Sequence, residues 1–167
     1  MSTGLADGFE PLSDRPRRLY DIWNRWRGGR RMPARRDVLP EELRDLLPYI
    51  ALMQATPNPL DCRYIISGDA VDRASDRGVK GMTIREVLAM GSHGVAGRNG
   101  ATGNRSIVEE ISAMYGAVIT DGEPSFSRGS MEYRDRGFIT FDRVLLPLAV
   151  DGRTVDHLLC GFFYNLG

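Results

Sequence analysis

Nine arginines lie within residues 15–36, and three aromatic residues, Tyr20, Trp23 and Trp26, are interleaved with them. Arginine side chains bind phosphate oxygens and aromatic rings stack on bases, so this segment has the residue types that bind a nucleic-acid strand. The alternative is a helix whose apolar side is buried and whose arginines face solvent, with Asp21 diluting their charge. We favour this second interpretation and keep a nucleic-acid-binding regulator, acting through the arginine-rich segment, as the alternative function.

The histidines and acidic residues offer little for catalysis or metal binding. His93 and His157 have no metal-type spacing to either cysteine, and an isolated histidine in a strand is most often a core residue. Asp156 and His157 are neighbours in a run that we expect to be extended, so they would point to opposite faces and not form a dyad. The sequence lacks the patterns of phosphate-binding loops, zinc hydrolases and serine hydrolases. We therefore expect no enzymatic activity and no metal site.

Charge is balanced over the 167-residue chain, because 22 basic and 22 acidic residues give a formal net charge of zero. A chain with this balance does not attract nucleic acid or anionic membranes as a whole. The N-terminus lacks the basic and apolar segments of a secretion signal, and no apolar run is long enough to span a membrane. We expect one cytoplasmic domain over residues 13–167, after a disordered segment 1–12, with both cysteines reduced and buried.

The arginine-rich segment is predicted to begin with a helix over residues 13–29. Its apolar residues, Leu19, Ile22, Trp23 and Trp26, are spaced i, i+3, i+4 and i+7, which places them on one side of a helix. The Gly28-Gly29 pair ends the pattern. A stripe with two tryptophans must be buried against another surface, and one face of a sheet can supply it.

The core, residues 40–167, is predicted to mix helices and strands. The longest helix begins with a capping pattern at Ser106, after a glycine-rich loop over residues 91–104. The run Leu158–Tyr164 is apolar on both faces, so it belongs to a central strand with layers on both sides. Five extended runs are expected, at residues 48–56, 61–67, 124–133, 141–150 and 154–164, with short helical pieces at 69–74 and 83–89.

Several sequence motifs resemble the PAS domain, and more narrowly a proteobacterial subfamily of single-domain PAS proteins. The resemblance implies an α+β fold with a five-stranded antiparallel sheet in the order 2-1-5-4-3, helices on one face and the N-terminal helix flanking the other. It makes the run 154–164 the central strand. The motifs are Leu19-Tyr-Asp-Ile-Trp23, Arg27-Gly-Gly-Arg-Arg-Met-Pro33, Leu46-Leu-Pro48, Cys62-Arg-Tyr-Ile-Ile-Ser-Gly68, Arg143-Val-Leu-Leu-Pro-Leu148 and Asp151-Gly-Arg-Thr-Val-Asp156.

The resemblance also implies a function. PAS domains hold a small ligand between sheet and helices, or a partner protein on the sheet or a flanking helix, and often form homodimers through N-terminal helices. We expect a sensory or regulatory module that signals to a separate protein, with Leu19, Ile22, Trp23 and Trp26 as the interaction or dimer surface.

The cofactor is left unknown. The segment 97–100 has glycine where a flavin-binding PAS domain carries its reactive cysteine, which excludes covalent flavin. Heme would need His93 or His157 as an axial ligand and is disfavoured.

The expected pocket lies between the longest helix and the sheet. Ile111, Met114, Tyr115 and Val118 share one face of that helix and should lie across from Ile66 and one alternate set of central-strand residues. The two possible sets are Val155, His157 and Leu159 on one face and Asp156, Leu158 and Cys160 on the other, and a one-residue shift in register would exchange them. Because burying Asp156 under the helices would be costly, we predict that the pocket contains His157, Leu159 and Phe163, with His157 as its polar group. A packed core without a cavity is the alternative.

Overall fold

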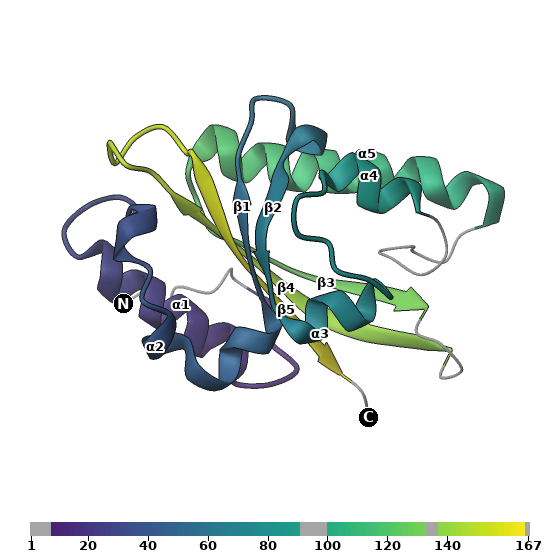
Figure 1. Ribbon diagram of the computed structural model, residues 1–167, viewed down its shortest axis with the longest axis horizontal. Coiled ribbons are helices and arrows are strands. Elements are labelled where there is room, and N and C mark those ends of the chain that lie inside the picture. Colours follow the sequence, from purple (N-terminus) through teal and green to yellow (C-terminus); the bar gives the residue numbers. More distant parts are fainter. Residues whose placement is uncertain (1–7, 91–99, 133–136, 166–167) are drawn as a thin grey trace.

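The computed structural model describes residues 8–90, 100–132 and 137–165, and only the backbone of residues 100–106 and 132. Five strands form an antiparallel sheet in the order β2-β1-β5-β4-β3, which confirms the predicted fold (Figure 1). The strand β5 is central, paired to β1 on one side and to β4 on the other. The strands are β1 Ile50–Gln54, β2 Arg63–Ser67, β3 Ser125–Glu132, β4 Phe138–Leu148 and β5 His157–Asn165.

Helices cover both faces of this sheet, as the apolar character of β5 required. Helix α1 lies on one face with α2 beside it, and α3, α4 and α5 lie on the other face (Figure 1). The helices are α1 Arg15–Arg27, α2 Pro40–Leu43, α3 Asp69–Ala74, α4 Ile84–Ala89 and α5 Gly100–Asp121, with 3-10 turns at Arg35–Asp37, Arg44–Tyr49 and Pro59–Asp61.

Helix α1 is held to the sheet by its predicted stripe. Leu19 is fully buried, and a Cβ atom added at Gly161 of β5 would lie 2.7 Å from its Cδ2 atom. The indole of Trp23 donates a hydrogen bond of 3.0 Å to the carbonyl oxygen of Pro147. Pairing between β3 and β4 extends only to Leu145, so Pro147, which has no N–H to donate, lies beyond the β3 pairing.

Two predicted boundaries are wrong. Helix α5 begins at Gly100, so the end of the predicted glycine-rich loop is helical, while residues 91–99 lie outside the described residues. Each added residue of a growing helix gains a hydrogen bond, which offsets the cost of glycine. Residues 8–12, predicted to be disordered, lie on the sheet, where the Leu12 N–H donates to the Asp142 carboxylate at 2.6 Å.

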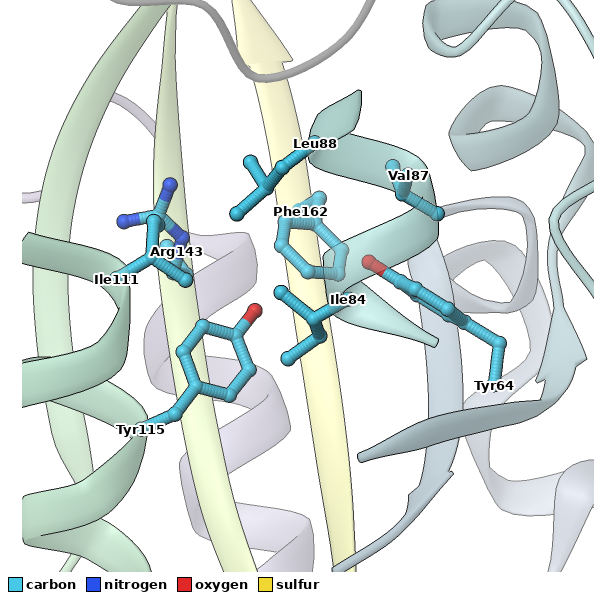
Figure 2. A pocket seen from close by; sticks show the side chains of 8 residues that line it. All are labelled: Tyr64, Ile84, Val87, Leu88, Ile111, Tyr115, Arg143 and Phe162. Atoms are coloured by element: carbon cyan, nitrogen blue, oxygen red, sulfur yellow. The ribbon is translucent and has the colours of Figure 1, made fainter. Parts of the chain in front are cut away.

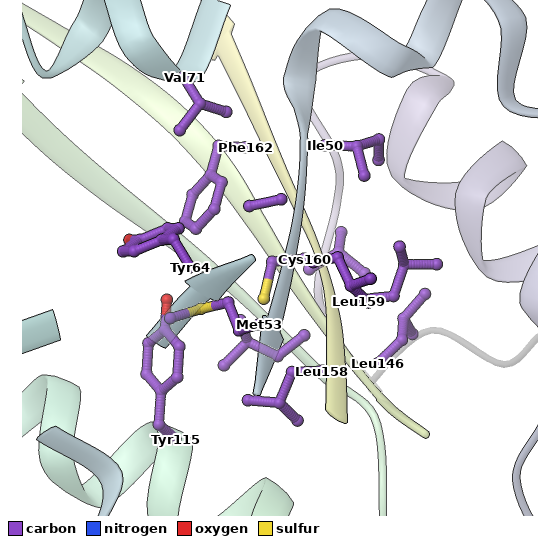
Figure 3. Close-up of a cluster of buried hydrophobic side chains, with 14 of the residues drawn as sticks. Ile50, Met53, Tyr64, Val71, Tyr115, Leu146, Leu158, Leu159, Cys160 and Phe162 are labelled. Carbon is purple, nitrogen blue, oxygen red and sulfur yellow. The ribbon is translucent and has the colours of Figure 1, made fainter. Parts of the chain in front are cut away.

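The predicted orientation of β5 is also wrong. Leu158, Cys160 and Phe162 point toward α5, whereas Leu159 points toward α1 (Figure 3). Phe163 lies on the α1 face too, because the Arg15 guanidinium sits 5.7 Å from its ring.

The error came from Asp156, which precedes the strand. The Asp156 carboxylate accepts a 2.7 Å hydrogen bond from the Val150 N–H in the turn. Because Asp156 lies before β5, the cost of burying its carboxylate does not decide which side chains of β5 point toward α5. The same carboxylate lies 2.7 Å from His157 Nδ1, so these neighbours do interact, contrary to our expectation.

Candidate ligand pocket

A cavity of about 20 Å³ lies between the sheet and helices α4 and α5 (Figure 2). This volume is room for one water molecule. A second cavity of about 20 Å³ adjoins it, and both are lined by Tyr64 and Phe162. The lining of the first cavity consists of Tyr64, Ile84, Val87, Leu88, Ile111, Tyr115, Arg143 and Phe162.

Each lining residue is positioned by regular structure. Arg143 and Phe162 are cross-strand partners in β4 and β5, so their side chains share the face covered by α4 and α5. Ile111 and Tyr115 are four residues apart on α5 and point to the same side. Helix α4 supplies the remaining apolar wall, and its first turn is capped by the Thr83 hydroxyl, which accepts a 3.1 Å hydrogen bond from the backbone N–H of Glu86.

Arg143 is the charged group of this cavity. It is only 4% exposed, and its Nε atom has no hydrogen-bond partner among the described residues. Its Nη1 atom lies 3.3 Å from the Met114 sulfur and 3.4 Å from the Ser127 hydroxyl, and its guanidinium carbon is 5.1 Å from the Phe141 ring. Among the described side chains, no carboxylate is within ion-pair distance. The buried guanidinium cation therefore has only weak partners among the described residues.

Two phenols complete the polar part of the cavity. The hydroxyl groups of Tyr64 and Tyr115 point toward the space between α4 and the sheet from opposite sides (Figure 2). Burial raises the pKa of both phenols well above its ordinary value. Both side chains are therefore neutral at physiological pH and can donate hydrogen bonds. The cavity lining therefore combines one cation, two neutral hydrogen-bond donors and apolar walls.

The predicted pocket residues divide between this site and other parts of the fold. Ile111 and Tyr115 line the cavity. Val118 is buried further along α5, and Met114 contacts Arg143 without lining the cavity. His157 is half-buried at the start of β5 and lies outside the cavity.

The remaining strand residues were assigned to the wrong face. Leu159 and Phe163 pack on the α1 side, for the reason given above. Ile66 is 52% exposed on the edge strand β2. The register between β1 and β2 shifts so that Leu52 faces Ile66 while Met53 faces Tyr64. This bulge places Tyr64, and not Ile66, under the helices.

The predicted interaction surface is mostly internal. Leu19 and Trp23 are buried against their own sheet, so a second copy of the chain has no access to them. Ile22 and Trp26 are partly buried beside the same core. The prediction of a dimer surface is therefore wrong for Leu19 and Trp23, whose burial is explained by the sheet alone.

The arginine-rich segment is partly neutralised by acidic neighbours. Ion pairs join Arg18 to Asp45 at 2.7 Å and Arg30 to Asp37 at 2.8 Å. Arg25 and Arg31 also lie within ion-pair distance of glutamates. Because these guanidinium groups already have carboxylate partners, the segment is a poorer phosphate-binding surface than its composition suggested.

Residues that sequence reasoning missed make up most of the site. They are Arg143 and Phe162 on the sheet, Tyr64 at the bulge, and the α4 residues Ile84, Val87 and Leu88. Over the described part of the chain, no three histidine, cysteine or acidic side chains are grouped to hold a metal ion. No helix in that part has the length and apolar character needed to cross a membrane.

This architecture, with a small site between a five-stranded sheet and its covering helices, defines a class of sensory domain. The PAS domain family model matches residues 13–162, and the chain belongs to that family. No curated protein matches the chain.

Several solved structures are similar to this chain at low identity. The PAS domain of Bordetella pertussis BvgS is 16% identical, with 77% of this chain and 87% of that chain covered and a TM-score of 0.48. A light-oxygen-voltage domain studied with a flavin analogue is 12% identical, with coverage of 75% and 82% and a TM-score of 0.49. An RNA-binding light-oxygen-voltage receptor is 16% identical, with a TM-score of 0.47, and this chain covers 32% of it.

Proposed function

We propose that this chain is a non-enzymatic sensory module that binds a small molecule between the sheet and helices α4 and α5, and signals to a separate protein through association. One observation carries the proposal, namely the buried Arg143 side chain that lines an interior cavity without a carboxylate partner among the described residues. An unpaired buried cation costs free energy, so a core that served packing alone would gain by replacing it. A bound molecule could supply the partner that the Arg143 guanidinium lacks.

Ligand entry requires the cavity to widen, since about 20 Å³ holds only a water molecule. Helix α4 is the element suited to move, because it has only six residues, Ile84–Ala89, and Leu88 is only half-buried over the cavity. Opening between α4 and the sheet would also join the second cavity through Tyr64 and Phe162, which both cavities share. Rearrangements of this kind are common where binding serves regulation.

Strand β4, which carries Arg143, offers a route for the signal. Asp142 and Arg143 are neighbours in β4, so one points toward α1 and the other into the cavity. The Asp142 carboxylate is fully buried and accepts hydrogen bonds from the Leu12 N–H at 2.6 Å and from Arg128 Nε at 3.0 Å. Movement of β4 on ligand binding would shift the N-terminal segment, and a partner on that face would sense the shift.

The test is native mass spectrometry of freshly purified protein, which reports both a retained small molecule and the number of subunits. Thermal unfolding against a metabolite panel follows, with Ile111→Phe as a variant that fills the cavity and Ile22→Phe as a control on α1. We expect ligand-dependent stabilisation in the wild type and in the control but not in Ile111→Phe. Absence of both a bound mass and any stabilisation would leave partner binding through the protein surface as the function.

A further inference from the structure

We infer that the ligand carries a single carboxylate, bound by Arg143, and a small apolar body that packs among the side chains of α4 and Phe162. The inference rests on the proposed function and names the chemistry of its ligand. Arg143 presents a planar fork of donors whose Nε edge is buried and has no partner among the described residues. A carboxylate matches such a fork with two parallel hydrogen bonds.

The surroundings contact the Nη1 atom of this fork and leave its Nε atom without a hydrogen-bond partner among the described residues. The ring of Phe141 lies 5.1 Å from the guanidinium carbon. Ser127, the cross-strand neighbour of Arg143 in β3, has its hydroxyl 3.4 Å from Nη1, and the Met114 sulfur lies 3.3 Å from the same atom. These contacts restrict the guanidinium from one side. The Nε atom, on the other edge, is buried and has no acceptor among the described residues.

The single positive charge of the cavity favours a ligand with one negative charge. Arg143 is the charged residue of the cavity lining, and burial keeps Tyr64 and Tyr115 as neutral phenols. A carboxylate balances one guanidinium, whereas a phosphate monoester carries about −1.5 to −2 charges at neutral pH and would leave charge unbalanced in a buried site. A neutral ligand would leave the Arg143 cation without a countercharge. A monocarboxylate therefore suits the site best.

The rest of the lining selects an apolar body. Ile84, Val87, Leu88 and Ile111 surround the cavity with aliphatic groups, and Phe162 supplies an aromatic wall. The phenol hydroxyls lie within the same space and can donate to a second oxygen of the ligand (Figure 2). Short-chain and aromatic monocarboxylates combine these features.

The experiment uses the full chain and pairs of probes that differ only in charge. Acetate, propionate and benzoate are titrated beside acetamide, propionamide and benzamide at constant ionic strength set with sodium chloride. The readout is the Arg143 Nε–H resonance in NMR spectra of ¹⁵N-labelled protein, assigned by its loss in Arg143→Met. We expect the acids, but not the amides, to shift this resonance saturably. Arg143→Met, followed through the methyl resonances of Ile111, should bind the acids about tenfold to a hundredfold more weakly.

A matched control removes a positive charge elsewhere. Arg153 is exposed in the turn before β5, so Arg153→Met should bind the acids as the wild type does. A resonance that no carboxylate moves, or that chloride moves equally, overturns the inference. If the amides shift the cavity resonances of the wild type and of Arg143→Met alike, the carboxylate assignment fails while the ligand-binding function stands. If, in addition, no retained molecule and no stabilising metabolite is found, the proposed function fails as well.

Discussion

Replacing Arg143 with methionine should make the unliganded protein more stable. The substitution removes a buried charge whose Nε–H has no partner among the described residues. Methionine is unbranched, as the arginine stem is, and can follow the same path along the Phe141 ring without a hydrogen-bonding requirement. If the cation serves a ligand and not the fold, its removal relieves the apo protein of a cost.

The magnitude follows from the contacts of this side chain. The unsatisfied donor costs about 1–3 kcal/mol, and transfer of the guanidinium from water adds to this cost. The contact with the Phe141 ring, 5.1 Å from the guanidinium carbon, returns up to about 2 kcal/mol. We expect the free energy of unfolding to rise by about 1–3 kcal/mol, since replacing buried charges by apolar groups stabilises proteins by about this amount. For a chain of this size, each kcal/mol raises Tm by about 2–4 °C.

The control is Arg128→Met on the neighbouring strand. Arg128 is 41% exposed, and its Nε donates a 3.0 Å hydrogen bond to the fully buried Asp142 carboxylate. Its loss leaves that carboxylate with one fewer donor, so the free energy of unfolding should fall by about 1.5–3 kcal/mol. Both variants are compared by urea unfolding. Destabilisation of Arg143→Met to the same extent as Arg128→Met would show that Arg143 supports the fold, and the ligand argument would lose its basis.

Two further predictions test the packing of α1 and the response to acid. Gly161→Ala should lower the free energy of unfolding in urea by about 1–3 kcal/mol, because the new Cβ would lie 2.7 Å from both Leu19 Cδ2 and Phe163 Cε2. Combined with Leu19→Ala, the total loss should be smaller than the sum of the two single losses, and strictly additive losses would contradict the contact with Leu19. The pKa of Asp37 lies below its usual value because its carboxylate accepts the Ala34 N–H at 2.8 Å and pairs with Arg30. The carboxylate therefore stabilises the fold fully above about pH 4, the pKa of an unfolded aspartate, and this stabilisation is lost as pH falls through the lower pKa of the folded state. Asp37→Asn should therefore flatten the acid side of the stability profile, and an unchanged profile would show that this carboxylate contributes nothing.

The layered fold could be predicted because its strongest signals are periodic. The stripe that includes Leu19 and Trp23 gave helix α1 its position and its buried side. The two-sided apolar run in β5 required cover on both faces, and α1 and α5 supply it. Long patterns of this kind average over many residues, so a single misplaced side chain does not change the result. The strand order itself came from the family resemblance.

The orientation of β5 could not be predicted in the same way, because it depends on one residue of register. Every side chain of a strand changes face when the register moves by one position. We fixed the face with Asp156, which lies before the strand and pairs with the turn N–H of Val150. Similarly, the bulge between β1 and β2 exchanged Ile66 for Tyr64 at the cavity. The first error arose just before β5 and the second at a bulge within β1 and β2, and in both places tertiary contacts and not periodicity determine the geometry.

The cavity cation was nevertheless within reach of the sequence. Asp142 and Arg143 are adjacent in a run that is otherwise apolar from Val144 to Val150, and that run pairs with a strand covered on both faces. In any register, one of these two charges must point under helices and the other toward the opposite layer. The carboxylate has protein donors in Leu12 and Arg128, whereas the guanidinium has only weak partners among the described residues. A charged pair in a doubly covered strand therefore indicates where to look for a ligand, and the member of the pair that the fold leaves without a countercharge indicates the charge of that ligand.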